Sequence, residues 1–319
     1  MKNNVSGEQL SSITEYPRIS GIRTVWRHEN MSENNNISDI YDLDPVFGDE
    51  TDSLPVFPVL SDENLTRIAE DMDRYGFGVV THCVSPDRLA SLARFVEKEV
   101  AASSGEYVAV VGSAPLTGTF LEKLPASPEF RAACEALYRK GTGKQPPSSP
   151  LYQLLRCLSG GSGEKHSFYF HYDSYILTIL LPVLIPSEGR TGDLVMLPNI
   201  RRIRKTYGAN LIDKVFLDRK IVQGALKKMV TSGILPVTRI RMVPGNIYFF
   251  WGYRSIHANE PCDRHRIRAT ALLHYGNPHE KSPMRNAVTR GRAAIMHGLR
   301  RSTRTAGSPV SQDSASALS

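Results

Sequence analysis

The chain has 319 residues, 41% of them hydrophobic, and a formal net charge of +7, which suits one large domain with a sizeable core. Its four cysteines show no CxxC spacing, which argues against a disulfide framework or a zinc knuckle and favours reduced thiols. The amino terminus has no apolar signal segment, and the longest apolar run, residues 175–186, is too short to cross a bilayer, so we expect a soluble, cytoplasmic protein without a membrane partner.

The sequence divides into a leader, a folded domain and a tail. Residues 1–56 are polar and aperiodic, with four Lys or Arg against ten Asp or Glu, and we expect a flexible leader. A single domain is predicted over residues 57–284. Residues 285–319 are expected to form a basic, mostly disordered tail, within which residues 293–299 could form a short helix.

Serine residues mark the starts of three helices in the first part of the domain. Ser61 is the expected N-cap of a helix over residues 62–75, whose apolar positions recur on one face. Ser-Pro pairs at positions 85–86 and 127–128 place serine at the N-cap and proline at the first helical position. Residues 75–80 are predicted to lead from a turn into a short strand.

From residue 151 onward the sequence is typical of β-structure. Short runs rich in β-branched and aromatic residues alternate with Gly, Pro and Asn turns, which predicts strands at 151–158, 167–172, 176–183, 193–197, 237–243, 246–251 and 266–275. A helical segment, about 199–232, is inserted among them. The expected fold class is therefore α+β, with N-terminal helices, a β-barrel or jelly-roll core and a helical insert between its strands.

The insert carries most of the excess positive charge. Residues 199–241 hold eleven Lys or Arg against two Asp. The insert could be a lid that brings Arg201, Arg202 or Arg204 to an anionic substrate. It could equally be a surface helix pair, or a dimer contact through Ile203, Tyr207 and Leu211. The sequence does not decide between these interpretations, and it leaves the oligomeric state open.

Three residues form a candidate metal site. In a strand, residues two apart point to the same face, so His171 and Asp173 can turn an imidazole and a carboxylate toward one metal ion. His257, a short turn after the strand at 246–251, can supply the third ligand. Two histidines and one carboxylate on one face of an octahedron are typical of non-haem Fe(II) oxygenases.

A basic residue and a hydroxyl follow at strand spacing. Arg268 and Thr270 share a face of the last predicted strand, and arginine binds a carboxylate through paired, charge-assisted hydrogen bonds. Together they could hold the distal carboxylate of 2-oxoglutarate. Arg266 is predicted to share that face and is the rival for this role. On the strand before the motif, Arg156 could line the site or serve the structure.

In this order, His171-x-Asp173, His257 and Arg268-Ala-Thr270 resemble the signature of the Fe(II)/2-oxoglutarate dioxygenase superfamily, most closely its phytanoyl-CoA-dioxygenase-like branch. The resemblance covers about residues 58–280 and implies a double-stranded β-helix, the jelly-roll or cupin-like core of that superfamily. It also implies that iron(II), 2-oxoglutarate and O2 bind at the motif. Thr178 is similar to a residue of the strand after the metal motif in many members, and we expect it beside the cofactor.

The resemblance further implies a hydroxylase that converts 2-oxoglutarate to succinate and CO2. Because Asp173 keeps a carboxylate on the metal, halogenation is not expected. The substrate would be a small metabolite or natural-product intermediate, with an anionic one favoured by the basic insert. Hydroxylation, desaturation and ring closure remain open.

The sequence also allows two alternative functions, and it contains further histidines near the motif. A nucleic-acid-directed demethylase would need aromatic residues interleaved with the basic ones, which the sequence lacks, so a nucleic-acid partner is not expected. A non-oxidative cupin-type barrel would not need Arg268 and Thr270. His166 and His265 lie in polar loops and are not expected to bind metal. His274 lies at strand spacing with Thr270 and could point inward, although a packing role is the simpler interpretation.

Overall fold

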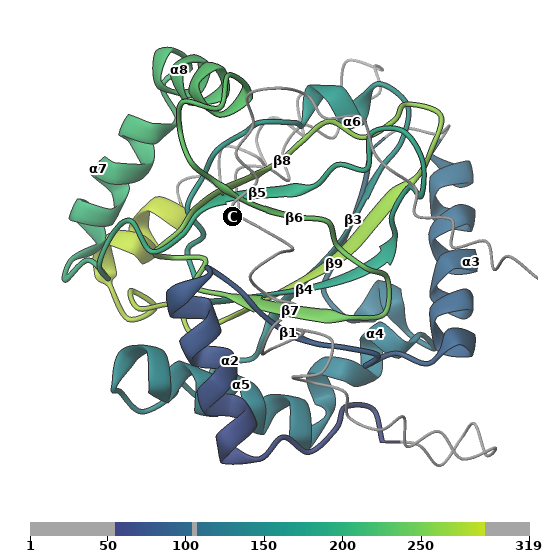
Figure 1. The fold of residues 1–319 in the computed structure, drawn as a ribbon. Coiled ribbons are helices and arrows are strands. Elements are labelled where there is room, and N and C mark those ends of the chain that lie inside the picture. Colours follow the sequence, from purple (N-terminus) through teal and green to yellow (C-terminus); the bar gives the residue numbers. More distant parts are fainter. Residues whose placement is uncertain (1–54, 104–106, 291–319) are drawn as a thin grey trace, which may run out of the picture.

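Two antiparallel sheets form the centre of the protein, which the computed structural model describes over residues 55–103 and 107–290 (Figure 1). The larger sheet has the strand order β1-β7-β4-β9-β3-β2, and the smaller has the order β6-β5-β8. The strands are β1 (Gly78–Val80), β2 (Val108–Val111), β3 (Tyr152–Leu158), β4 (Leu177–Leu184), β5 (Leu194–Leu197), β6 (Thr238–Ile240), β7 (Ile247–Phe250), β8 (Ile256–Asn259) and β9 (Arg268–Tyr275). Together with the helices, these sheets confirm a mixed α and β fold. The predicted leader up to residue 54 and the predicted helix at 293–299 lie outside the described residues.

From β3 onward the chain passes repeatedly between the sheets. β3, β4, β7 and β9 belong to the large sheet, whereas β5, β6 and β8 belong to the small one. Between β3 and β4 the chain also pairs with the small sheet, because His171 forms an isolated antiparallel bridge with His257 of β8. Segments far apart in sequence therefore become neighbours.

Four helices precede β3, with two short 3-10 turns among them. They are α2 (Asp62–Arg74), α3 (Pro86–Ala102), α4 (Phe120–Lys123) and α5 (Pro128–Thr142), with η2 (Ala114–Leu116) and η3 (Leu124–Ala126). The predicted caps are confirmed, since the Ser61 hydroxyl accepts a hydrogen bond from the Asn64 amide at 3.1 Å, and Ser127 accepts one from the Phe130 amide at 3.3 Å. The large sheet lies between these helices and the small sheet (Figure 1).

Strand alternation gives β9 two different faces. One face packs on the helices, as shown by Tyr275, whose ring meets Tyr138 of α5 edge-on with centroids 5.9 Å apart. The opposite face, which we call the inner face, carries Arg268, Thr270 and His274. Paired residues of antiparallel strands share a face, and the register pairs Thr270 with Arg156 of β3 and His274 with Thr178 of β4. Polar side chains from three strands are therefore gathered on one buried surface.

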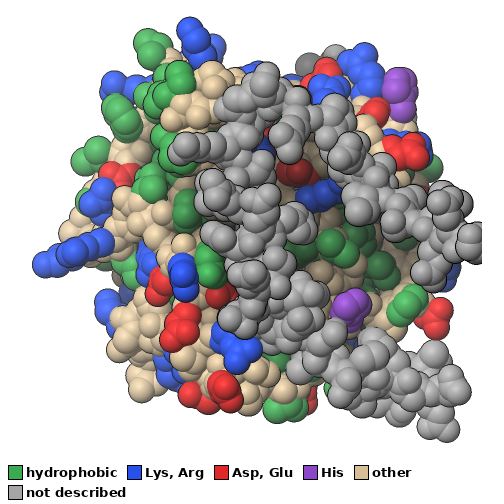
Figure 2. All heavy atoms as spheres, viewed as in Figure 1, with side chains coloured by type: hydrophobic (Ala, Val, Ile, Leu, Met, Phe, Trp, Pro, Cys, Tyr) green, Lys and Arg blue, Asp and Glu red, His purple; other side chains and the backbone are tan. Residues whose placement is uncertain are grey.

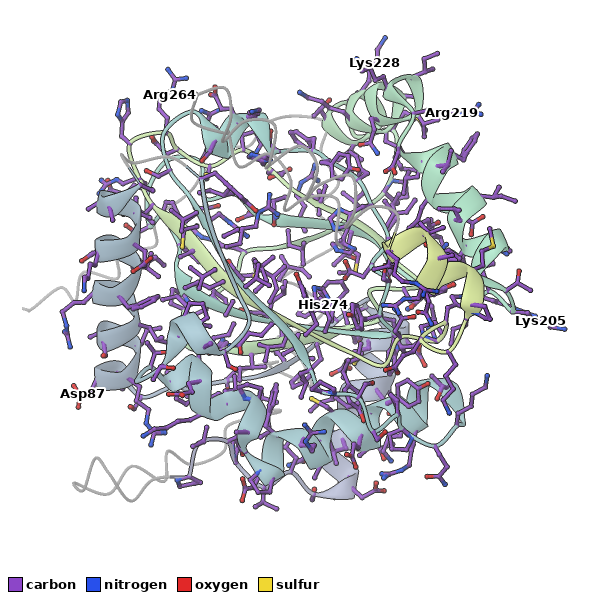
Figure 3. All side chains as sticks on the ribbon, turned by 180° about the vertical axis from the view of Figure 1, so that it is seen from behind. Asp87, Lys205, Arg219, Lys228, Arg264 and His274 are labelled. Carbon is purple, nitrogen blue, oxygen red and sulfur yellow. The ribbon has the colours of Figure 1, made fainter. Side chains whose placement is uncertain are left out.

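The helical insert lies between β5 and β6, as predicted. It consists of α7 (Tyr207–Leu217) and α8 (Lys220–Thr231), whereas residues 199–206 are not helical. Figure 3 shows Lys205, Arg219 and Lys228 projecting outward from this region. Among the described residues, no helix combines the length and apolar character that crossing a bilayer requires.

The apolar surface of the insert differs from the predicted one. Ile203, Tyr207 and Leu211 are half-buried, because they face the protein. The hydrophobic side chains that gather on the outer surface of the insert (Figure 2) include Ile212 and Ile221, which are 70% and 87% exposed. Ile203, Tyr207 and Leu211 are therefore less exposed than these two residues, and a dimer contact through them stays a prediction.

Several strand assignments also differ. Residues 167–172 do not form a strand, because Phe168 has a positive φ of 51°. The segment is joined to β8 by the His171 bridge and by a hydrogen bond from the Phe168 amide to the Asn259 carbonyl at 2.7 Å. Two strands, β2 and β8, were not predicted. The predicted disordered tail also begins too early, since residues 285–290 are part of a helical segment over 283–290.

Candidate metal centre and the residues around it

His171, Asp173 and His257 come together on the inner side of the small sheet. One potential ligand atom from each residue lies within 4.8 Å of the other two, and no other such group of three is present in residues 55–103 and 107–290. The Asp173 Oδ1 atom is 3.6 Å from His171 Nε2, and its Oδ2 atom is 3.5 Å from His257 Nε2. The carboxylate thus faces both imidazoles, as a facial arrangement of three ligands requires.

The other ring nitrogen of each histidine contacts a backbone carbonyl. His171 Nδ1 is 3.0 Å from the Tyr169 oxygen, and His257 Nδ1 is 3.2 Å from the Ser255 oxygen. Because a carbonyl oxygen can only accept, each Nδ1 must carry the proton in the neutral ring. The Nε2 lone pairs are left facing Asp173, which is the tautomer a metal ligand needs.

Asp173 is almost completely buried and is oriented by Thr178. The Thr178 hydroxyl donates a short hydrogen bond to Asp173 Oδ2, and His274 Nδ1 lies 3.2 Å from the same hydroxyl. Since the hydroxyl proton is committed to the carboxylate, His274 donates to the hydroxyl oxygen. The structure places Thr178 against the carboxylate of the candidate metal centre, and its predicted contact with the cofactor stays a prediction.

His274 is therefore part of this polar cluster. Figure 3 shows it in the interior, among the strands. Its ring is 3% exposed and stacks on Tyr175, with centroids 5.4 Å apart. His274 therefore has more than the packing role favoured from the sequence, because it also donates a hydrogen bond to the Thr178 hydroxyl.

Electrostatics favour the cation-binding forms of Asp173 and His171. Burial alone would raise the pKa of Asp173, but the nearby His257, His274 and His171 and the Thr178 hydrogen bond outweigh it and lower this pKa well below its usual range. Burial, followed by repulsion from His257, lowers the pKa of His171 to about 3. At neutral pH the carboxylate is therefore charged and the His171 ring is neutral.

A glycine makes room for the carboxylate. The Gly252 carbonyl accepts a hydrogen bond from the Asp173 amide at 3.1 Å. A Cβ atom at this position would overlap both the Thr178 hydroxyl and Asp173 Oδ2. Gly252 therefore allows the β7–β8 turn to approach the metal centre closely.

The segment that carries His171 is held from two sides. On one side, the His171 amide and carbonyl exchange hydrogen bonds with His257, both at 3.1 Å. On the other side, the Gln223 side chain of α8 accepts from the Phe170 amide at 2.9 Å and donates to the Phe170 carbonyl at 2.7 Å. The Gln223 amide thus acts like a neighbouring strand, which explains why the segment is ordered without belonging to a sheet.

The insert also brings a cation to the metal centre. Lys214 of α7 donates to the hydroxyl of Ser174, which follows Asp173, at 2.8 Å, and its charge helps to lower the pKa of His171. The interpretation of the insert as a lid names Arg201, Arg202 or Arg204, and not Lys214, as the cation offered to an anionic substrate.

Two of those arginines have other partners. Arg201 and Arg204 both bind Asp213, at 2.8 and 2.6 Å, and Arg201 is buried. Arg202 is exposed and lines a cavity of about 320 Å³, together with Arg201, Arg254 and their neighbours Asn199 and Ile203. Helix spacing could have identified Lys214, which lies on the same side of α7 as the half-buried Leu211.

Arg268 is oriented by the small sheet. Its Nε donates to the Gly192 carbonyl at 3.0 Å, and its Nη2 donates to Asn259 Oδ1 at 3.0 Å. Asn259 lies two residues after His257 on β8, which is about 6.6 Å along the strand. Arg268 therefore binds β8 at about this distance from His257. Burial, followed by repulsion from Arg156, lowers the pKa of Arg268 to about 10.

The two residues predicted beside Arg268 have different environments. The Thr270 hydroxyl is buried and has no hydrogen-bond partner among the described residues. Arg266 precedes β9, is exposed and lies 3.6 Å from Glu188. The expectation that Arg266 shares the face of Arg268 is wrong, because β9 begins only at Arg268 and strand alternation does not extend to Arg266.

His166 and His265, which the sequence did not favour as metal ligands, lie outside the cluster. His166 contacts the Tyr107 ring, with centroids 4.7 Å apart, and His265 is exposed. Neither belongs to the group of potential metal ligands found in the described part of the chain.

Comparison with known proteins gives only distant structural likenesses. No protein-family model matches the sequence, and no curated protein matches it. A prolyl-4-hydroxylase from Pseudomonas putida is 12% identical, with 67% of this chain and 98% of that chain covered and a TM-score of 0.43. A prolyl hydroxylase from Trichoplax adhaerens, in complex with a hypoxia inducible factor peptide, is 12% identical, with 69% and 92% covered and a TM-score of 0.45. The epimerase SnoN, in complex with Fe3+, alpha ketoglutarate and nogalamycin RO, is 17% identical, with 68% and 85% covered and a TM-score of 0.43.

All three TM-scores are below 0.5. Function must therefore be inferred from the residues of this chain.

Proposed function

We propose that this protein is a non-haem Fe(II)- and 2-oxoglutarate-dependent oxygenase that hydroxylates a small molecule, with release of succinate and CO2. The observation that carries the proposal is the convergence of two Nδ1-protonated imidazoles and one ionised carboxylate on a single point. The proposed fold is a double-stranded β-helix, and the proposed affiliation is with the phytanoyl-CoA-dioxygenase-like branch. The repeated passage of the chain between two antiparallel sheets supports this fold.

The donor set fits iron(II). Two imidazoles and one carboxylate leave three positions of an octahedron open, whereas structural zinc sites are closed by four protein ligands. His171, Asp173 and His257 would hold the ion, and Thr178 would fix the carboxylate through its hydrogen bond. Bound iron would supply the activation of O2 that is coupled to decarboxylation of the 2-oxo acid.

The second half of the proposed site is the anchor for the 2-oxoglutarate side chain. Arg268 forms no ion pair with any described residue, and the buried Thr270 hydroxyl has no partner there. A buried charge without a counter-ion is costly, so an anionic ligand at this point would stabilise it. Arg268 binds Asn259, which lies two residues after His257 on β8. Arg268 could therefore anchor the distal carboxylate of a short dicarboxylate whose other end reaches the metal.

For the substrate we propose a small, anionic molecule. Lys214 approaches the metal centre from α7, and a cation beside a reacting centre favours an anionic ligand by attraction. The same helix pair holds the His171 segment through Gln223, so the insert would cover one side of the site. We expect the insert to restrict access by solvent and to contribute to substrate selection.

The proposal is tested by product formation. With Fe(II), ascorbate, 2-oxoglutarate and air, the purified protein should form succinate slowly, and an anionic substrate should accelerate the reaction. Asp173→Ala should abolish succinate formation, whereas His265→Ala, at an exposed histidine, should leave it unchanged. Absence of succinate from folded, iron-loaded wild-type protein across a panel of small acids would favour the non-oxidative cupin-type alternative.

A further inference from the structure

Two unpartnered polar atoms lie side by side on the inner face. Among the described residues, buried side-chain atoms without a hydrogen-bond partner include Arg156 Nε and Thr270 Oγ1. These residues are directly paired in the register of β3 and β9, so their side chains leave the sheet on the same face. Buried donors are nearly always satisfied in folded proteins, and a pair of adjacent exceptions therefore indicates a ligand.

Arg268 is buried, and Arg156 is half-buried with a buried Nε atom. Asp193 attracts Arg268 but does not form an ion pair with it. Neither guanidinium forms an ion pair with a described residue. Burial lowers the pKa of both side chains, and repulsion from Arg156 lowers the pKa of Arg268 further. Arg156 is paired with Thr270, which lies two residues from Arg268 on the same face of β9, so both arginine side chains leave the sheet on one face. Like charges buried together are unfavourable unless a counter-ion joins them.

The neighbours of Arg156 leave its inner side uncrowded. The register places it between Ala109 of β2 and Thr270 of β9, and both have short side chains. The Tyr107 ring lies 5.8 Å from the guanidinium carbon and supports it by a cation–π contact. Arg156 is thus held at the sheet while its Nε–H group remains without an acceptor.

We propose that Arg156 is a second guanidinium anchor for the distal carboxylate of 2-oxoglutarate, acting beside Arg268 and Thr270. This inference rests on the proposed function and adds a residue to it. A carboxylate offers about four lone-pair sites. Arg268, the Thr270 hydroxyl and the Arg156 Nε–H can occupy them together, so the site selects 2-oxo acids that carry a distal carboxylate.

Calorimetric titration of anaerobic, Mn(II)-loaded protein tests the inference. The probes are 2-oxoglutarate and 2-oxopentanoate, which has the same carbon chain but no distal carboxylate. Arg156→Met should raise the Kd for 2-oxoglutarate by about 10- to 100-fold, the usual effect of losing a hydrogen bond to a charged group. Its Kd for 2-oxopentanoate should stay within about twofold of wild type. Arg156→Lys should give an intermediate Kd, because lysine keeps the charge but not the planar fork.

Thermal unfolding distinguishes an anchor from a structural residue. Because Arg156→Met removes a half-buried charge that forms no ion pair with a described residue, the ligand-free variant should be at least as stable as wild type, and its Mn(II) affinity should be unchanged. Arg266→Met, at an exposed arginine, is the matched control and should match wild type in every titration.

Unchanged 2-oxoglutarate affinity in Arg156→Met would overturn this inference and leave the proposed function intact. Equal weakening of both probes, or a large loss of ligand-free stability, would also overturn it. Failure of Mn(II)-loaded wild-type protein to bind 2-oxoglutarate would overturn the proposed function itself.

Discussion

The side chain of Gln223 should control the metal affinity from a helix outside both sheets. It makes three hydrogen bonds that Gln223→Ala removes, two to Phe170 and one from its Nε2 to the Leu217 carbonyl at 2.8 Å. Phe170 is only 1% exposed, so its amide and carbonyl would lose their partners in a buried environment. His171 is the next residue, and its position depends on this segment.

The expected cost follows from these contacts. Leaving two buried backbone groups unsatisfied costs about 1–3 kcal/mol each, and the recovered side-chain entropy offsets at most about 2 kcal/mol. A net loss of about 2 kcal/mol corresponds to an approximately 30-fold increase in Kd. Because the metal binds only the ordered arrangement, this loss should be seen as weaker metal binding.

Anaerobic calorimetry measures the affinity for Mn(II), and thermal unfolding of the metal-free protein measures its stability, so the two effects of Gln223→Ala are separated. Lys228→Ala changes an exposed residue of the same helix and is the control. Gln223→Glu should be intermediate, because it keeps the acceptor for the Phe170 amide but loses the donor. An Mn(II) Kd within twofold of wild type in Gln223→Ala would refute the positioning role.

Three further predictions concern the metal centre. Gly252→Ala should weaken Mn(II) binding at least tenfold, because the new Cβ atom would displace Asp173. Gly224→Ala is the control, because there is open space around Gly224; in urea unfolding it should be as stable as wild type or up to about 1 kcal/mol more stable. Thr178→Val removes the hydrogen bond to the carboxylate and should raise the Mn(II) Kd by about 10- to 100-fold in the same calorimetric assay; no change would assign the threonine to packing. The metal-free protein should become less stable as the pH falls from 6.5 toward 3, because His171 takes up its proton at a higher pH in the unfolded chain than in the folded protein. In urea unfolding, this group should change the free energy of unfolding by at most about 1.4 kcal/mol per pH unit. The His171→Asn variant should lose this contribution.

Local signals predicted the three long helices before β3, the helical insert and most strands correctly. The Ser-Pro starts of α3 and α5 are readable because the cap and the first helical position lie next to each other in sequence. The strand that carries His257 was missed, because Ile256–Asn259 is short and half polar, and it becomes a strand only by pairing with β5. The grouping of His171, Asp173 and His257 was predictable from residue types, although the strand assumed for the first two does not form.

The residues that support the ligands could not be predicted, because long-range contacts define them. Nothing in the sequence near Gln223 indicates that it binds Phe170, which lies 53 residues earlier. The position of the Arg156 Nε atom, which has no hydrogen-bond partner among the described residues, depends in the same way on the register between β3 and β9. Arg266 was misplaced because the start of β9 was predicted two residues too early.

Anaerobic titration of the protein with Fe(II) and 2-oxoglutarate tests the central claim most directly. Chelation of iron by the 2-oxo acid gives a weak charge-transfer band in the visible spectrum. Wild-type protein should develop this band, His171→Ala should not, and Arg268→Ala should need far more 2-oxoglutarate to reach the same intensity. A band of normal intensity and affinity in His171→Ala would contradict the assignment of the metal ligands.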